Sequence, residues 1–161
     1  MKDEYIALID DTKRELDEIR KWINNGKNKF DSKMKYLISY SVIKSSGSIE
    51  VIFKGMVYDY LSCGANMEAK QYMMKMVLDS SCNPNTGNIS NMLQNLSGEW
   101  KEKFDVDVKS SGCKDKLNSL VQLRNDFAHG ANINVSIDTV ITYFNSAVEI
   151  LKILENTMKP E

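Results

Sequence analysis

The chain has few of the residues that usually mark a disulfide scaffold, a metal centre or a loop-rich fold. Its 161 residues include one histidine, three cysteines and two prolines. The cysteines are odd in number and show neither CxxC nor Cys/His ligand spacing, so they indicate neither a disulfide framework nor a zinc site. We therefore expect reduced thiols, no bound metal ion and no other cofactor.

Net charge and long apolar runs are missing as well. The 21 Lys and Arg residues nearly balance the 22 Asp and Glu residues, so no overall positive field draws the protein onto nucleic acid, and any such binding must be local. No segment reaches the roughly 18 apolar residues of a membrane span, and the first residues lack the apolar core of a signal peptide. These absences predict a cytoplasmic protein without a membrane partner.

Apolar residues recur at helical spacing along almost the whole chain. With 42% apolar residues, residues 1–161 suit a single domain with one core. The spacing predicts an all-α fold, a bundle of five or six helices. The expected helical segments are about 3–25, 33–63, 67–78, 89–104 with a break near Ser97-Gly98 as the alternative, a segment that Gly130 ends, and a last one that Ser136 begins.

The second of these segments contains the sequence SSGS, Ser45 to Ser48, which in isolation is typical of a loop. The apolar stripe keeps its phase on both sides of these four residues, and small side chains inside a helix allow another backbone to approach closely. We predict one continuous helix with a tight crossing at this point.

The only histidine, His129, lies next to Gly130 at a predicted helix end, five positions after Arg124. Histidine changes its charge near neutral pH, and a guanidinium on the edge of an apolar stripe usually needs an anion or another acceptor. From the residues alone a purely structural interpretation stays open. In that case His129 is a helix C-cap residue and Arg124 is a surface ion-pair partner.

Three other residues are candidates for supporting roles, two of them between Arg124 and His129 and one far away in the sequence. Asn125 precedes His129 by four residues and so lies on the same side of the helix, where it either orients the imidazole, contacts ribose or serves as a polar cap. Asp126 points elsewhere on the helix and is expected to be solvated. Glu50, in the long second helix, is a candidate partner for Arg124; the alternative is a solvated position. Phe127 shares the apolar face of this helix, and Phe127→Ala should lower the free energy of unfolding by about 3 kcal/mol or more if its ring is buried.

The segment LRNDFAHG, residues 123–130, resembles the Rx4-6H signature of the HEPN superfamily. The similarity extends over roughly residues 30–155. YLISYSVIKSSGSIEVIFKGMVYDYL is similar to the long second helix of HEPN domains, and SSCNPNTGNISNMLQNLSGEWKEKF and SIDTVITYFNSAVEIL are similar to later segments of the RiboL-PSP-HEPN group. The chain is therefore identified as a HEPN-like helical bundle of that group.

This resemblance implies a helical fold that dimerises, so that two copies of the motif face each other across a cleft. Members with an intact motif are commonly metal-independent endoribonucleases in toxin–antitoxin, anti-phage or RNA-processing systems. RNA, a second copy of the chain and a neutralising antitoxin or other defence-system protein are the expected partners. Other members are catalytically inactive assembly or nucleotide/RNA-binding subunits, and this function is the alternative.

The residues permit a chemical account of RNA cleavage in which the 2′-hydroxyl attacks the adjacent phosphorus. The reaction needs a proton acceptor, a proton donor and positive charge beside the phosphate. We expect Arg124 to hold the phosphate, His129 to transfer protons and Asn125 to assist them, with Glu50 and Asp126 in substrate-binding or supporting positions. One histidine in each chain favours a homodimer.

Overall fold

The computed structural model describes residues 1–28 and 31–159, and within them it contains helices and no strand. The helices are α1 (Asp3–Asn24), α2 (Met34–Ser62), α3 (Met67–Met73), the short π-helix η1 (Met74–Leu78), α4 (Thr86–Leu96), α5 (Gly98–Ser111), α6 (Lys114–Ala128) and α7 (Ile137–Met158). The predicted all-α fold is confirmed. The described residues form seven α-helices, more than the five or six expected.

The additional helix arises at Ser97, where the alternative expected for residues 89–104, a break near Ser97-Gly98, is confirmed. Ser97 has an extended backbone, with φ −159° and ψ 126°. Its N–H donates to the Leu93 carbonyl at 2.8 Å, which ends α4, and its hydroxyl accepts from the Trp100 N–H at 3.4 Å, which begins α5. One serine therefore acts as the C-cap of one helix and the N-cap of the next.

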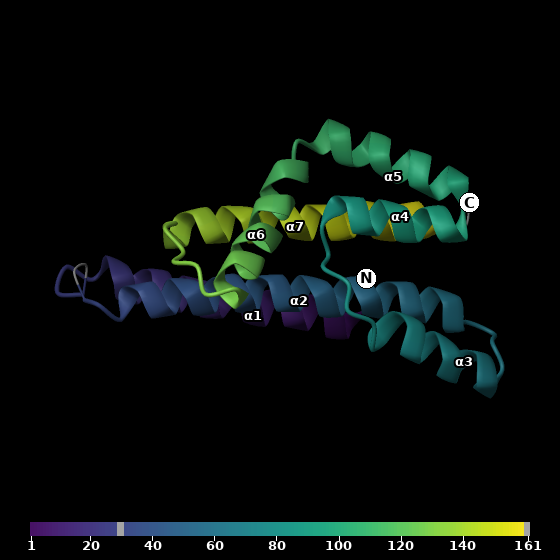
Figure 1. Cartoon of the computed structure of the whole chain (residues 1–161), viewed down its shortest axis with the longest axis horizontal. Helices are drawn as coiled ribbons and strands as arrows, with labels where there is room; N and C mark the ends of the chain where they lie inside the picture. The colour runs from purple at the N-terminus through teal and green to yellow at the C-terminus, as the bar shows by residue number, and fades with distance from the viewer. Residues whose placement is uncertain (29–30, 160–161) are drawn as a thin grey trace.

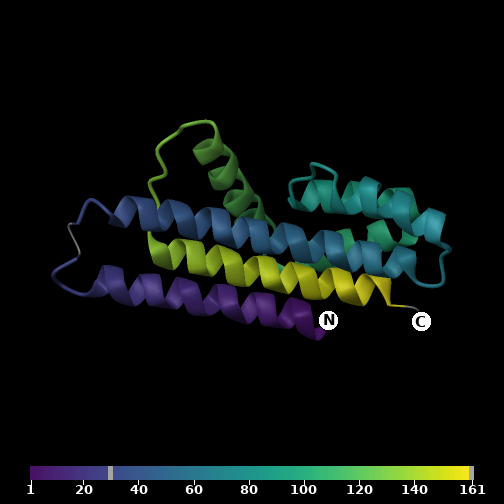
Figure 2. The ribbon, with the colours of Figure 1, turned by 90° about the horizontal axis from the view of Figure 1, so that it is seen from below.

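Three long helices, α1, α2 and α7, run alongside one another and form the body of the molecule (Figures 1 and 2). α6 crosses α2 and α7, while α4 and α5 pair with each other and α5 packs against α7. The core between these layers holds the fully buried rings of Phe53, Phe104 and Phe144. α6 is thus held in place by contacts with both α2 and α7.

α2 continues without a break through Ser45–Ser48, as predicted. All three serines of this sequence are buried, and the Ser48 hydroxyl lies 2.8 Å from the hydroxyl of Thr12 in α1. Farther along α2, a Cβ at Gly55 would lie 2.5 Å from the Tyr5 hydroxyl. Small side chains therefore allow α1 to lie close against α2 along much of its length.

The helix that α3 begins ends in a π-turn, η1, in which the Asp79 N–H donates to the Met74 carbonyl five residues earlier. π-turns hold one more residue than an α-turn and often occur at functional sites. Here the turn leads into residues 79–85, an irregular segment that returns across α2 toward α4. Among the described residues, no helix has the length and apolar character that crossing a membrane requires.

Candidate functional site

The predicted motif, residues 124–129, occupies the last turns of α6 and its C-cap. Gly130 adopts a left-handed backbone with φ +83°. The Gly130 N–H donates to the Phe127 carbonyl at 3.0 Å, and the Ala131 N–H donates to the Asp126 carbonyl at 2.9 Å. This pair of bonds is a Schellman motif, which glycine allows because it has no Cβ. These two hydrogen bonds fix the backbone of His129 at the end of the helix.

Arg124 is half-buried and continues the line of the buried residues Leu117, Leu120 and Val121 on α6. Its Nη1 donates to the Asn125 Oδ1 at 3.2 Å and to the Asn83 Oδ1 at 3.3 Å. Both acceptors are neutral amide oxygens, so the guanidinium is held in place while its positive charge is not cancelled by a carboxylate. Such a group is suited to binding an anion.

His129 is exposed, and its imidazole forms no hydrogen bond with any other described residue. Positions 124 and 129 are about 140° apart around a helix with 100° per residue. The guanidinium of one chain is directed to Asn83, in the segment before α4, while the imidazole of the same chain is exposed to solvent. One chain does not bring the two side chains into contact.

Glu50 has a partner other than Arg124. Its Oε1 accepts from Lys54 Nζ at 2.6 Å, one turn later on α2. Lys54 is 7% exposed and also donates to the Ser80 carbonyl, directly after η1. Glu50 is thus half-buried in an ion pair, and no hydrogen bond joins it to Arg124 among the described residues. The pairing suggested by the sequence is not what the structure contains.

The segment after η1 connects this ion pair to the arginine. Cys82 is half-buried, and this burial raises the pKa of its thiol; nearby Lys54 acts in the opposite direction and Glu50 in the same one. The next residue, Asn83, accepts from Arg124 through its side chain and from the Asn88 side chain through its carbonyl, the latter at 2.8 Å. Residues 80–83 therefore lie between the middle of α2 and the end of α6. Neither Lys54 nor Asn83 was expected from the sequence.

The other motif residues have local contacts. Asp126 Oδ1 accepts from the Gln122 side chain at 2.6 Å, so this half-buried carboxylate is held on its own helix and not fully solvated. The Asn125 carbonyl accepts from the His129 N–H at 3.0 Å, and the Asn125 side chain accepts from Arg124. Phe127 is 36% exposed, so its ring is not buried although it shares the apolar face of α6. Its turn of α6 extends past the neighbouring helices, where apolar spacing no longer means burial.

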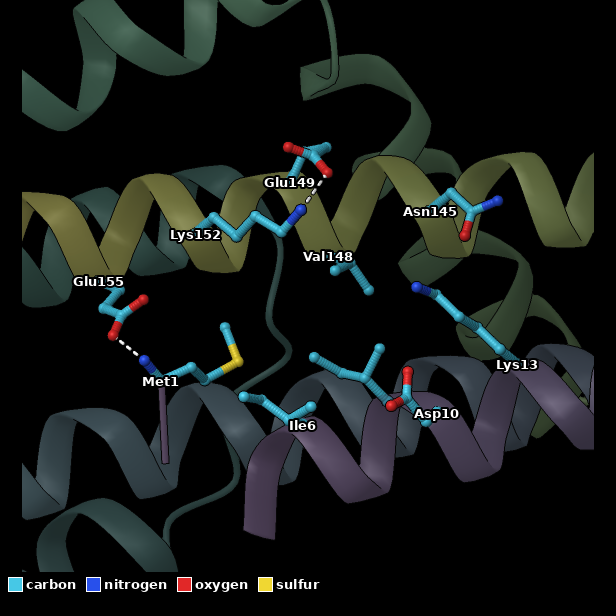
Figure 3. Close-up of a pocket in the computed structure, with 10 residues that line it drawn as sticks. Met1, Ile6, Asp10, Lys13, Asn145, Val148, Glu149, Lys152 and Glu155 are labelled. Atoms are coloured by element: carbon cyan, nitrogen blue, oxygen red, sulfur yellow. Dashed lines mark hydrogen bonds and ion pairs between the residues drawn. The ribbon is translucent and has the colours of Figure 1, made fainter. Parts of the chain in front are cut away.

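A separate hollow between α1 and α7 has a different character (Figure 3). Asp10 and Lys13 of α1 lie across from Asn145 and Val148 of α7. Several of its charged groups are already paired, as in the contact of Lys152 with Glu149 at 2.7 Å and that of the Met1 amino group with Glu155. In the described parts of the chain, no three His, Cys, Asp or Glu side chains are placed to hold a metal ion.

A known protein family matches the chain over most of its length. The model of the family described as RiboL-PSP-HEPN matches residues 10–159, which include α6 and the motif. No curated protein and no solved structure matches the chain. The family match indicates a nuclease or RNA-binding function of the HEPN type.

Proposed function

The chain belongs to the RiboL-PSP-HEPN family, and on this basis we propose that it is a metal-independent endoribonuclease. The observation that carries the proposal is the difference between the surroundings of Arg124 and those of His129. Arg124 is held by two neutral acceptors, and His129 is displayed at a capped helix end. The first residue is prepared to bind a phosphate, and the second is free to transfer a proton.

In the proposed reaction the RNA supplies its own nucleophile. A neutral imidazole removes the proton of the 2′-hydroxyl as O2′ forms a bond to phosphorus, and the P–O5′ bond breaks as O5′ takes a proton from an imidazolium. The products are a 2′,3′-cyclic phosphate and a 5′-hydroxyl. The guanidinium of Arg124 stabilises the charge that grows on the non-bridging oxygens. Asn125 supports this role by accepting a hydrogen bond from Arg124.

Two proton transfers and one histidine in each chain favour a site composed from two chains. An exposed apolar side chain within the motif supports a homodimer with α6 at its interface, because Phe127 is 36% exposed on α6. A two-fold axis beside α6 would bring a second Arg124 and His129 to the same phosphate. In the dimer, Phe127 would be covered by the partner chain.

The proposal is tested by incubating a mixed-sequence RNA with the wild-type protein and His129→Ala in EDTA. We expect the wild type to cleave the RNA and to leave 2′,3′-cyclic phosphate ends or the 3′-phosphates derived from them. Ends with 3′-hydroxyls, or a strict requirement for magnesium, would count against the reaction. If neither protein cleaves RNA but both bind it, the inactive RNA-binding function would replace the nuclease.

The composite site is tested by mixing subunits. Arg124→Ala and His129→Ala homodimers should both be inactive, whereas a heterodimer with one variant of each kind keeps one intact arginine and one intact histidine. Activity in the heterodimer would show that the two chains share a site in which one arginine and one histidine suffice, whereas an inactive heterodimer is expected if each proton transfer needs its own histidine. Light scattering should give the mass of a dimer at tens of micromolar, and a monomer at that concentration would exclude the shared site.

A further inference from the structure

The turn between α1 and α2 concentrates positive charge. Residues 20–36, RKWINNGKNKFDSKMKY, contain six Lys and Arg residues and one acidic residue. The rest of the chain then has 15 basic and 21 acidic residues. The overall balance of charge therefore conceals a basic segment attached to an acidic body. We call the described residues of this segment, 20–28 and 31–36, the basic turn.

The lysines that the structure describes in the basic turn are available to a ligand. They are all exposed, and none forms an ion pair with an acidic side chain of residues 1–28 or 31–159: Lys21, Lys27, Lys33 and Lys35. Arg20 differs, because it pairs with Asp17 at 2.9 Å. Asp31, the acidic residue of the turn, accepts from the Lys33 backbone N–H at 2.8 Å. A cluster of unpaired lysines attracts a polyanion.

Aromatic rings lie among these lysines. Trp22 and Tyr36 line a hollow of about 570 Å³, and its other lining residues are Glu18, Ile19, Lys33 and Leu37. The Tyr36 side chain is 65% exposed. Lys35 Nζ lies 5.0 Å from the centre of the Tyr36 ring. An exposed ring beside an ammonium offers a base a surface for stacking and offers its phosphate a counter-charge.

We propose that the basic turn binds single-stranded RNA, with its lysines on the phosphates and a base stacked in the hollow between Trp22 and Tyr36. The combination of charge with an aromatic hollow favours RNA over an acidic peptide or an anionic lipid surface, for which the lysines alone would suffice. The turn lies at the end of the molecule where α6 joins α7 (Figures 1 and 2). This inference rests on the proposed function, because the bound strand is the substrate of the motif.

The experiment measures binding of a fluorescent single-stranded RNA of about 20 nucleotides to the full chain carrying His129→Ala, so that cleavage does not interfere. The test protein also has all four described lysines of the basic turn changed to Gln. The matched control loses the same charge at exposed lysines outside the turn: Lys70, Lys75, Lys103 and Lys109. We expect Kd to rise at least tenfold in the test protein and less than threefold in the control.

The salt dependence and the ring provide separate measurements. The slope of log Kd against log salt should fall by about 0.7 for each RNA phosphate that the test protein no longer neutralises. Tyr36→Ser alone should weaken binding about fivefold or more, because it removes the stacking surface but no charge. Equal affinities of the test and control proteins would overturn the proposal. Loss of binding to phosphatidylserine vesicles with unchanged RNA binding would overturn it too.

Failure of this inference can be told apart from failure of the nuclease proposal. A dinucleoside monophosphate lacks the longer strand that the basic turn is proposed to bind, so the lysine variant with an intact motif should cleave it at the wild-type rate. The same variant should cleave the long RNA more slowly at low substrate concentration. If His129→Ala cleaves RNA as fast as wild type while the lysine variant binds RNA poorly, the proposal that the basic turn binds RNA is supported and the nuclease proposal fails.

Discussion

The two ends of the motif are five residues apart on one helix but lie in different surroundings. Arg124 is half-buried, and two side-chain amides accept from its guanidinium. His129 is exposed and is fixed only through its backbone, by the cap that Gly130 completes. A residue that binds charge must be held still, whereas a residue that transfers protons needs access to its substrate. The difference suggests that changes at the two ends should affect activity and stability in different ways.

The largest effect is expected at the exposed end. His129→Ala should reduce RNA cleavage by roughly a hundredfold or more, because it removes the group proposed to transfer protons. Its free energy of unfolding should change by less than about 0.5 kcal/mol, since an exposed side chain without a partner contributes little to folding. Cleavage rates in EDTA and thermal unfolding measure the two quantities. A strongly destabilised variant would mean that His129 has a structural role.

The next largest effect on RNA cleavage is expected at Arg124, whose side chain is held by two hydrogen bonds. Arg124→Lys keeps the charge but loses the planar fork that can reach a phosphate and two amide oxygens together. We expect cleavage to fall by roughly tenfold to a hundredfold, and the free energy of unfolding to fall by about 1 kcal/mol because a hydrogen bond is removed. Single-turnover kinetics and denaturant titration provide the test. Full activity in the lysine variant would show that charge alone suffices.

Asn83→Ala separates positioning from catalysis. Removing one acceptor leaves the Arg124 guanidinium less constrained, so we expect cleavage to fall by several-fold, with most of the decrease in kcat. Asn91, exposed on α4, is a matched control, and Asn91→Ala should behave as wild type. Equal rates for the two variants would remove Asn83 from the site.

Two glycines allow a smaller, purely structural comparison. Gly130→Ala places a Cβ on a left-handed backbone with φ +83°, which should lower the free energy of unfolding by about 1 kcal/mol. Gly47 lies inside α2 with no atom within 4 Å of an added Cβ, so Gly47→Ala should raise it by about 0.5 to 1 kcal/mol. Chemical denaturation measures both. A Gly130→Ala variant as stable as the wild type would contradict the proposed role of the cap.

The helical positions, the continuity of α2 through Ser45–Ser48 and the helix end at Gly130 were predictable, because spacing and capping act over a few residues. The two hydrogen-bond acceptors of Arg124 could not be predicted equally well from the sequence. Asn125 is its neighbour in sequence, whereas Asn83 is 41 residues away and reaches α6 only through the path of residues 79–85. Glu50 was an attractive partner for Arg124, but Lys54 lies one turn away on the same helix and forms the ion pair.

The π-turn after α3 makes the geometry of the site sensitive to the length of one short segment. Each residue of an α-helix advances the chain by about 100° and 1.5 Å. Deleting one residue from Met74–Leu78 would restore an ordinary α-helix and rotate everything after it by that angle. The Ser80 carbonyl would then leave Lys54, and Asn83 would leave Arg124, although no residue of the motif had changed. The extra residue of the π-turn thus sets the positions of Ser80 and Asn83 relative to Lys54 and Arg124. The geometry of the site therefore depends on the length of this segment as well as on the residues in it.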